Sequence, residues 1–212
     1  MTLATDWVTI SALATAAGTL VLALATFASV RSANRAARVA ERSLLVGLRP
    51  LLVPSRLDDP PRKVNFSEGR YLVAPGGAAV AEVHDDAVLL AAAMRNVGAG
   101  IAVLHGWHFY SDIVRTADHL APEEFTRLTR DIFIAPGEVG FWQGTFRDPS
   151  APAFTEARQI VEAREGWTVE VLYGDAEGGQ RMISRYAMLP REDGGWLASA
   201  GRHWYVDRDG PR

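Results

Sequence analysis

Apolar positions run without interruption through the first part of the chain and give way to short alternating runs after residue 49. Residues 7–30 carry no charge, and the seven of them that are not apolar are Thr, Ser or Gly. A helix of this length reaches roughly 36 Å and can cross a hydrocarbon core of about 30 Å. Its hydroxyl groups can donate to the carbonyl one turn back and so cost little in lipid. The pattern predicts a short N-terminal tail, residues 1–6, and a transmembrane helix, residues 7–30.

The charges that flank this segment predict its orientation. A cleaved signal peptide needs basic residues before its apolar region, but the only charged side chain upstream is that of Asp6, and the basic residues all follow. By the positive-inside rule, this arrangement keeps the C-terminal side in the cytoplasm and the N-terminus outside. A buried helix of a soluble protein is disfavoured because the apolar surface continues all the way round. With one Lys against 21 Arg and much Ala and Gly, we expect the inner membrane of a bacterium with a GC-rich genome.

A basic helical stem is predicted over residues 31–48, where good helix formers precede Gly47 and Pro50, which stop a helix. Arginines spaced four, three and four apart lie on one face of such a helix. We interpret this face as the contact with anionic lipid headgroups at the membrane interface, and recognition of a specific partner is the alternative. The arginines are Arg31, Arg35, Arg38 and Arg42.

A stripe of small residues runs along both the predicted span and the stem. Small residues let two helices approach closely in lipid, where no hydrophobic force drives helices together. One interpretation is a homo-oligomer joined through this stripe, and the other is that an Ala-rich helix produces such stripes by chance. The expected helix-packing residues are Ala12, Ala16, Ala23, Ala33, Ala37 and Ala40.

Short runs of alternating or β-branched residues separated by turn residues fill residues 49–207, which is the pattern of an antiparallel β-sandwich. The clearest hairpin crosses the Gly-rich turn Gly174–Gly179. Two short helical insertions are predicted, at Pro122–Thr129 and Thr155–Ala163, and the second could equally be a strand. A C-terminal tail, residues 208–212, follows the domain. Strands are expected near residues 51–56, 79–83, 87–96, 103–111, 139–146, 168–173, 181–189 and 203–206.

The most distinctive motif of this domain is the junction Asn96-Val97-Gly98-Ala99-Gly100 between two apolar strands. Two Gly after an Asn allow positive φ, so that the chain can bulge or cross from one sheet to the other. A dinucleotide-binding loop would need a third Gly near Val103 and a following helix, and the residues after Gly100 predict a strand instead. We therefore expect Asn96, Gly98 and Gly100 to form a strand junction that binds no phosphate.

Together with the preceding anchor and the later Tyr173-Gly174-Asp175 turn, this junction resembles a loose group of uncharacterised bacterial single-pass membrane proteins. These proteins carry an Asn-x-Gly-x-Gly-x-Ala strand junction in an immunoglobulin-like domain, often with Pro before the Ala, where this chain has Ile101. The resemblance covers most of the chain. It implies a mainly β fold class, in which an N-terminal transmembrane helix and helical stem precede an antiparallel immunoglobulin-like β-sandwich, and it brings no activity with it.

Charge is distributed unevenly along the chain. Residues 31–63 carry eight basic and three acidic side chains, a net +5, while residues 64–212 carry 14 basic and 21 acidic side chains, a net −7. The basic part favours contact with anionic headgroups, and the acidic part argues against nucleic acid as a partner. The absence of Cys excludes a disulfide framework and thiolate metal or redox sites.

Candidate residues for metal binding or acid–base chemistry lack the spacing that such sites need. His105 and His108 are three apart in a predicted strand and so point to opposite faces unless the strand bulges. No nucleophile elbow, His-Glu-x-x-His helix or Walker-type loop occurs in the sequence. The tryptophans of the domain are expected mainly in its core, with an exposed aromatic and cationic patch at Arg202–Tyr205 as an alternative. We predict no catalytic, cofactor-binding or metal-binding residue.

Function is therefore predicted from architecture. The main hypothesis is a membrane-anchored, non-enzymatic protein-interaction or scaffold module of unknown process. The alternative is an oligomeric membrane sensor or effector whose cytoplasmic β-sandwich binds a ligand and rearranges the transmembrane helices. The expected partners are the lipid bilayer, a second copy of the chain through its transmembrane helix, and an unknown protein, with no cofactor.

Overall fold

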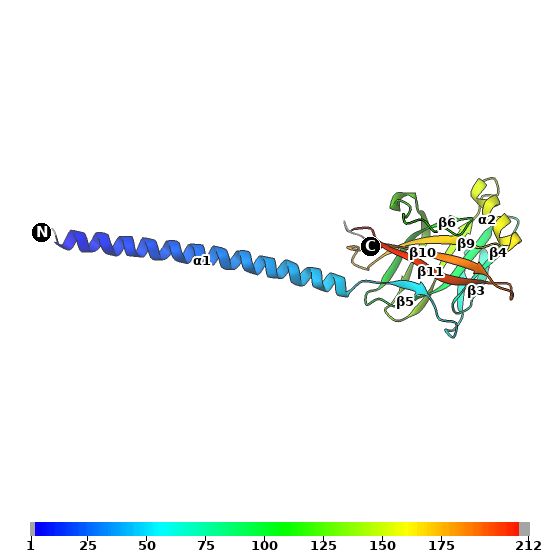
Figure 1. Cartoon of the computed structure of the whole chain (residues 1–212), viewed down its shortest axis with the longest axis horizontal. Coiled ribbons are helices and arrows are strands. Elements are labelled where there is room, and N and C mark those ends of the chain that lie inside the picture. The colour runs from blue at the N-terminus through cyan, green and yellow to red at the C-terminus, as the bar shows by residue number, and fades with distance from the viewer. Residues whose placement is uncertain (1–2, 208–212) are drawn as a thin grey trace. The chain divides into compact units, whose positions relative to one another are not determined.

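The computed structural model describes residues 3–207, apart from the side chains of residues 3–6, 42, 45, 46 and 68. The chain forms two compact units, Met1–Val46 and Gly47–Arg212. Figure 1 shows the helix that makes up the first unit and the strands that make up the second. The predicted tail 208–212 and the first two residues of the predicted tail 1–6 lie outside the described residues.

The first unit is a single helix, α1 (Leu3–Gly47), which ends at Gly47 as predicted. Within it, Trp7–Glu41 is long and apolar enough to cross a membrane. Its Thr side chains satisfy their own hydroxyl groups within the helix, because Thr19 Oγ1 donates to the Thr15 carbonyl oxygen at 2.8 Å and Thr26 Oγ1 donates in the same way one turn back. This bonding removes the cost of placing hydroxyl groups in lipid.

The second unit is built on an antiparallel sheet, whose strands in the described part of the chain follow the order β1-β5-β4-β11-β10-β9-β6-β7, with β8 also paired to β5. Figure 1 shows β9, β10 and β11 side by side. A separate hairpin, β2–β3, and one helix, α2, complete the domain. The bounds are β1 Leu52–Pro54, β2 Arg62–Asn65, β3 Tyr71–Ala74, β4 Ala78–Val83, β5 Val88–Asn96, β6 Ala102–Tyr110, β7 Thr126–Ile134, β8 Val139–Phe146, α2 Pro152–Ala163, β9 Trp167–Gly174, β10 Arg181–Pro190 and β11 Trp196–Tyr205, with 3-10 turns at Ser67–Gly69 and Pro122–Glu124.

Strand β5 lies at the centre of this fold. Its first seven residues, VLLAAAM, are buried, as expected for a strand that is covered on both faces. Leu90 and Met94 belong to the main core, whereas Leu89 and Ala91 pack under the β2–β3 hairpin. One edge of β5 pairs with β8 along its length, and the other edge pairs first with β4 and then with β1. The domain therefore has the layered, sandwich-like form predicted.

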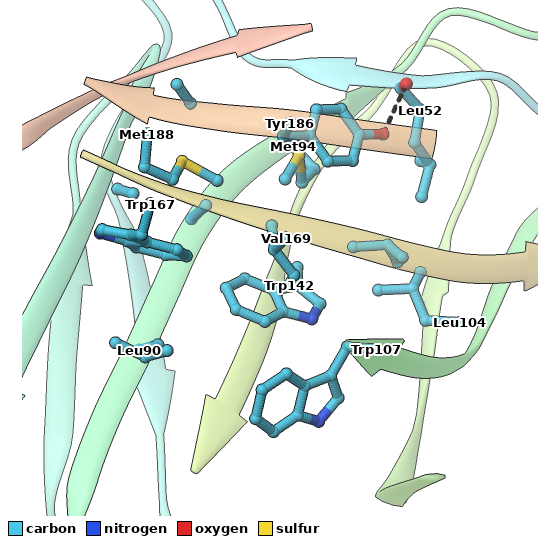
Figure 2. Packing of buried hydrophobic residues seen from close by; sticks show 14 of the residues in the cluster. Leu52, Leu90, Met94, Leu104, Trp107, Trp142, Trp167, Val169, Tyr186 and Met188 are labelled. Atoms are coloured by element: carbon cyan, nitrogen blue, oxygen red, sulfur yellow. Dashed lines mark hydrogen bonds between the residues drawn. The ribbon is translucent and has the colours of Figure 1, made fainter. Parts of the chain in front are cut away.

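The main core is filled by large aromatic rings from several strands. Figure 2 shows Trp107, Trp142 and Trp167 in this core. The Trp107 and Trp142 rings meet edge to face, with centroids 5.6 Å apart, a favourable arrangement of aromatic quadrupoles. Tyr186, which is fully buried, donates its hydroxyl to the Leu52 carbonyl oxygen at 2.8 Å and so ties β10 to β1.

A buried ion pair fastens the segment after β6 to the outer face of β9 and β10. The Arg185 guanidinium and the Glu170 carboxylate are 4% and 0% exposed, and they are hydrogen-bonded to each other. Arg185 also donates to the Thr116 and Asp118 carbonyl oxygens at 2.8 and 2.6 Å. The second oxygen of Glu170 accepts the Leu120 N–H at 3.1 Å. Because hydrogen bonds with the segment after β6 satisfy both side chains, the pair is compensated although it is buried.

Most of the predicted elements are confirmed, and a few differ from the prediction. The hairpin across Gly174–Gly179 is formed by β9 and β10, and the second helical insertion is α2. The first predicted helix, Pro122–Thr129, is only a 3-10 turn that leads into β7, because pairing with β6 overrides the local helical preference. The hairpin β2–β3 was not predicted, and β11 begins seven residues before the predicted strand, at Trp196 instead of residue 203.

We predict that Glu170→Gln lowers the free energy of unfolding by about 3–5 kcal/mol, because it leaves the Arg185 charge buried without a counter-charge. Urea unfolding of the full-length chain in detergent, followed by tryptophan fluorescence, measures this loss. The matched control is Glu162→Gln, since Glu162 forms an exposed pair with Arg158 in α2 and should change the same free energy by at most about 0.5 kcal/mol. Equal losses in the two variants would contradict the prediction.

Candidate functional site

The two ends of the curled sheet, β7 and β8, are consecutive in the chain but form no ladder with each other among the described residues. The tight turn Ala135–Glu138 joins them, and its Glu138 N–H donates to the Ala135 carbonyl oxygen at 3.1 Å. Beyond the turn, β8 continues along β5 from Val139 to Phe146, while β7 follows β6. Because each strand has its partner on the other side, their facing edges remain unpaired.

Strand β7 is irregular where it pairs with β6. Ile132 pairs with Leu104 of β6, but the next paired residue of β7, Arg127, lies opposite Gly106. One residue of β6, His105, thus faces the four residues 128–131 of β7. Extra residues of this kind bend a strand and leave its backbone groups out of the ladder, and bulges are frequent beside binding sites.

Between β7 and β8 lies a cavity of about 580 Å³, which is within the range of ligand-binding pockets. Trp107 of β6 contributes to its wall, and Gly144 leaves room for the Trp142 and Trp107 rings, since a Cβ there would lie 3.0 and 3.1 Å from them. We call this cavity the β7–β8 cleft. Its lining residues are Asn65, Phe66, Ser67, Trp107, Thr126, Arg127, Leu128, Thr129, Arg130, Gln143, Gly144, Thr145 and Arg147.

The β7–β8 cleft is a basic site in an acidic domain. Three arginines line it, and none of its described lining residues is acidic, whereas residues 64–212 as a whole carry a net charge of −7. Arg130 of β7 donates to the Gln143 side-chain oxygen of β8 and so spans the cleft. Arg147 donates to Ser67 Oγ at 2.9 Å. Within the described part of the chain, Arg127 has neither a hydrogen bond nor an ion pair, so its five donors are available to a ligand.

The groups that line the β7–β8 cleft can bind an anion. Guanidinium groups, threonine hydroxyls and the Gln143 amide supply hydrogen-bond donors. The described lining residues include no His, Asp, Glu or Lys that could act as a general base. Such a set of groups fits a carboxylate or another anionic group.

Comparison with known proteins assigns no family to the chain. No family model and no curated protein matches the sequence. The structure has the general architecture of the proteins that the sequence resembles, an N-terminal apolar helix followed by an antiparallel β-domain.

The predicted strand junction lies where the chain enters the domain, away from the β7–β8 cleft lining. Asn96 is fully buried, and its side chain makes four hydrogen bonds. Its Oδ1 accepts the Leu51 and Gly98 N–H groups at 3.1 and 3.0 Å, while its Nδ2 donates to the Gly100 and Ile134 carbonyl oxygens at 2.7 and 2.9 Å. The amide therefore satisfies backbone groups from three segments at once.

Gly98 and Gly100 do not adopt the positive φ that glycine allows. Among the described residues, the glycines with positive φ lie at five turns elsewhere. What these two positions require is close approach, because a Cβ at Gly98 would overlap the Arg49 carbonyl oxygen, and one at Gly100 would overlap the Leu48 carbonyl oxygen. Absence of a side chain lets the residues after the helix lie directly against the junction. The five glycines with positive φ are Gly69, Gly77, Gly137, Gly178 and Gly194.

Six of the ten site residues predicted on α1 line two grooves on its surface. Arg31, Arg35 and Arg38 line one groove together with Asn34. The Arg42 side chain lies outside the described residues. A second groove is lined by Ala12, Ala16 and Ala23 with Thr15 and Thr19 between them, and Ala33, Ala37 and Ala40 are exposed further along the same helix.

The histidines are dispersed over the domain. His105 and His108 could face the same side of β6 only if this strand bulged at or between them. Such a bulge is present, since the register of β6 shifts between Leu104 and Gly106. His105 nevertheless lies near Asp131 and Asp175, while His108 lies near Glu170 and Glu124, and no group of three potential metal ligands occurs among the described residues. Burial lowers the pKa of His105, His108 and His203, which disfavours their protonated forms.

The tryptophans largely follow the prediction. Trp107, Trp142, Trp167 and Trp196 are in the main core. Trp204 does contact a cation, the Arg185 guanidinium, which lies 4.9 Å from its ring. Because Arg185 is buried, this contact lies inside the domain and not on an exposed patch. Its indole N–H donates to the Ala117 carbonyl oxygen at 3.1 Å.

Sequence reasoning missed the arginines of the β7–β8 cleft. Arg127 lies near the end of the predicted helix Pro122–Thr129, Arg130 directly follows that helix, and Arg147 follows a predicted strand. The repeated Thr-Arg in Thr126-Arg127-Leu128-Thr129-Arg130 was the available indication, because β-branched Thr favours a strand over a helix.

We predict that Gly100→Ala lowers the free energy of unfolding by about 3 kcal/mol or more, since the new methyl group would overlap a backbone carbonyl that cannot move independently. Urea unfolding of the full-length chain in detergent measures the change. Gly179→Ala is the control, because its Cβ would meet only Asp175 Oδ2, at 3.9 Å, and should cost at most about 0.5 kcal/mol. A Gly100→Ala protein as stable as the control would show that this close approach is absent.

Proposed function

We propose that the chain is a membrane-anchored, non-enzymatic protein-interaction module. The observation that carries this proposal is the β7–β8 cleft, which offers donors for an anionic partner and, in its described lining, no general base. A domain on such an anchor meets partners at the membrane surface, so the anchor sets where binding takes place. The immunoglobulin-like family resemblance is part of the proposal, and the sandwich-like layering around β5 supports it.

The location that we propose is the bacterial inner membrane, with the N-terminus outside and the β-domain in the cytoplasm. The apolar stretch Trp7–Glu41 supports a membrane anchor. Arg31, Arg35 and Arg38 share one groove of the helix at the C-terminal side of its uncharged part. Arginines in this position favour the cytoplasmic side and attract anionic headgroups.

A second candidate function is that of an oligomeric sensor or effector. It is favoured by the groove along α1, where Ala12, Ala16 and Ala23 leave space at helical spacing. A second helix in this groove could approach closely, and a ligand bound to the β-domain would act by changing how the helices pack.

We predict that a C-terminal fusion to green fluorescent protein fluoresces in bacterial cells, while the same fusion to alkaline phosphatase is inactive, because the arginines retain the β-domain in the cytoplasm. Replacement of Arg31, Arg35 and Arg38 by Ala should give mixed orientation. Replacement of three domain arginines, Arg115, Arg158 and Arg202, is the matched control and should leave orientation unchanged. An active phosphatase fusion of the unaltered chain would contradict the proposed topology.

We predict that Ala12→Cys, introduced into this Cys-free chain, forms disulfide-linked dimers when membranes are oxidised, as the second candidate function requires. Ala16→Leu in the same background should reduce crosslinking several-fold, because it fills the groove. Ala14→Leu adds the same side chain on the opposite face of the helix and should leave crosslinking unchanged. Absence of dimers in all three proteins would remove the basis of the oligomeric candidate.

A further inference from the structure

The β7–β8 cleft has a property that a simple anion pocket does not need: two free sheet edges border it. Strand β7 is at one end of the sheet order, and β8 pairs with the edge of β5 opposite to the one used by β4 and β1. In an antiparallel ladder, alternate residues direct their N–H and C=O groups away from the paired neighbour. Each of the two strands therefore presents backbone donors and acceptors toward the cavity of about 580 Å³.

We propose that an extended acidic segment of a partner protein binds in the β7–β8 cleft as an additional strand paired with both β7 and β8, antiparallel to one of them and parallel to the other. This proposal rests on the proposed function as an interaction module and names the chemistry of its partner. One added strand would satisfy both free edges, which is how strand addition obtains its affinity. Free edges are otherwise sites of uncontrolled association.

The charges of the β7–β8 cleft select the side chains of that segment. Arg127 and Arg130 lie on β7, and Arg147 directly follows β8, so guanidinium groups stand on both sides of the inserted strand. Arg130 donates to the neutral Gln143 side chain across the cleft. A carboxylate that replaced Gln143 as its partner would add the opposite charge and could accept two parallel hydrogen bonds from the guanidinium. Glu or Asp in the partner is therefore favoured over neutral residues.

The bulge of β7 leaves part of this strand outside its ladder with β6. Residues 128–131 have no ladder partner on β6, so a partner strand can pair with this part of β7. The Trp107 ring and Gly144 in the wall provide an apolar surface for alternate side chains of the inserted segment. A segment with acidic residues alternating with apolar ones meets both features.

The test uses the full-length chain in nanodiscs of zwitterionic lipid and a displayed library of random 12-residue peptides. We expect the selected peptides to carry Asp or Glu at alternate positions and to bind Arg127→Glu at least about tenfold more weakly. Arg202→Glu changes the net charge equally on an exposed residue of β11 outside the cleft, and it should retain full binding. Arg127→Lys should recover part of the affinity, because it restores the charge without the forked donor geometry.

A proline scan of one selected peptide distinguishes strand insertion from capture of an isolated anion. A strand between β7 and β8 uses every central N–H, alternately toward each edge, so Pro at each of two consecutive central positions should weaken binding about tenfold. Loss at only one of the two positions, or at neither, would overturn the proposal. Three other results would also overturn it. These are selection of peptides without acidic residues, binding to Arg127→Glu as tight as to the unaltered chain, and displacement of the peptide by inorganic phosphate as effectively as by free peptide at constant ionic strength.

These results are separable from the proposed function. Folding of the variants is checked by their tryptophan fluorescence, which reports the core. Membrane location and topology are measured independently by the fusion proteins, so a correctly anchored chain that binds no acidic peptide would reject this inference alone.

Discussion

Burial of β5 on both faces is the constraint on which the rest of the domain depends. Its side chains alternate between the main core, where Leu90 and Met94 pack, and the β2–β3 hairpin, which covers Leu89 and Ala91. Such burial requires that its backbone groups be satisfied by neighbouring strands. Three strands supply this pairing, β8 on one edge and β4 and β1 on the other. The small residues Ala91, Ala92 and Ala93 let both layers approach the strand.

The β7–β8 cleft is formed where the two ends of the sheet meet. Strand β8 pairs with β5 and β7 pairs with β6, and no ladder joins β7 to β8 among the described residues. Three arginines line the cavity between them. Because β8 is held by its ladder with β5, the burial of β5 fixes one wall of the cleft.

Periodicity in the sequence was sufficient for the long helix, for most strands and for the β9–β10 hairpin, because each of these elements is determined by local pattern. Periodicity could not predict strand β7, because the Pro-Glu-Glu sequence just before it favours a helix. Pairing with β6 outweighs that local preference. The register shift at His105 was also out of reach, since a bulge reverses which alternate positions face the core. Gly98 and Gly100 were recognised as constrained, but the reason lies in contacts with residues about 50 positions earlier, which only the fold brings near.

The uneven charge of the chain adds a further step to the argument about partners. A domain with a net charge of −7 over residues 64–212 repels acidic molecules at long range. Attraction at the β7–β8 cleft acts only at short range, through guanidinium groups within a partly enclosed cavity. Salt screens interactions between exposed charges over about 10 Å at 0.1 M, and it screens those in partly buried sites much less. Moderate salt therefore weakens the long-range repulsion by the domain more than the attraction in the cleft. An acidic segment can then reach the cleft, while the remaining acidic surface offers it no binding site.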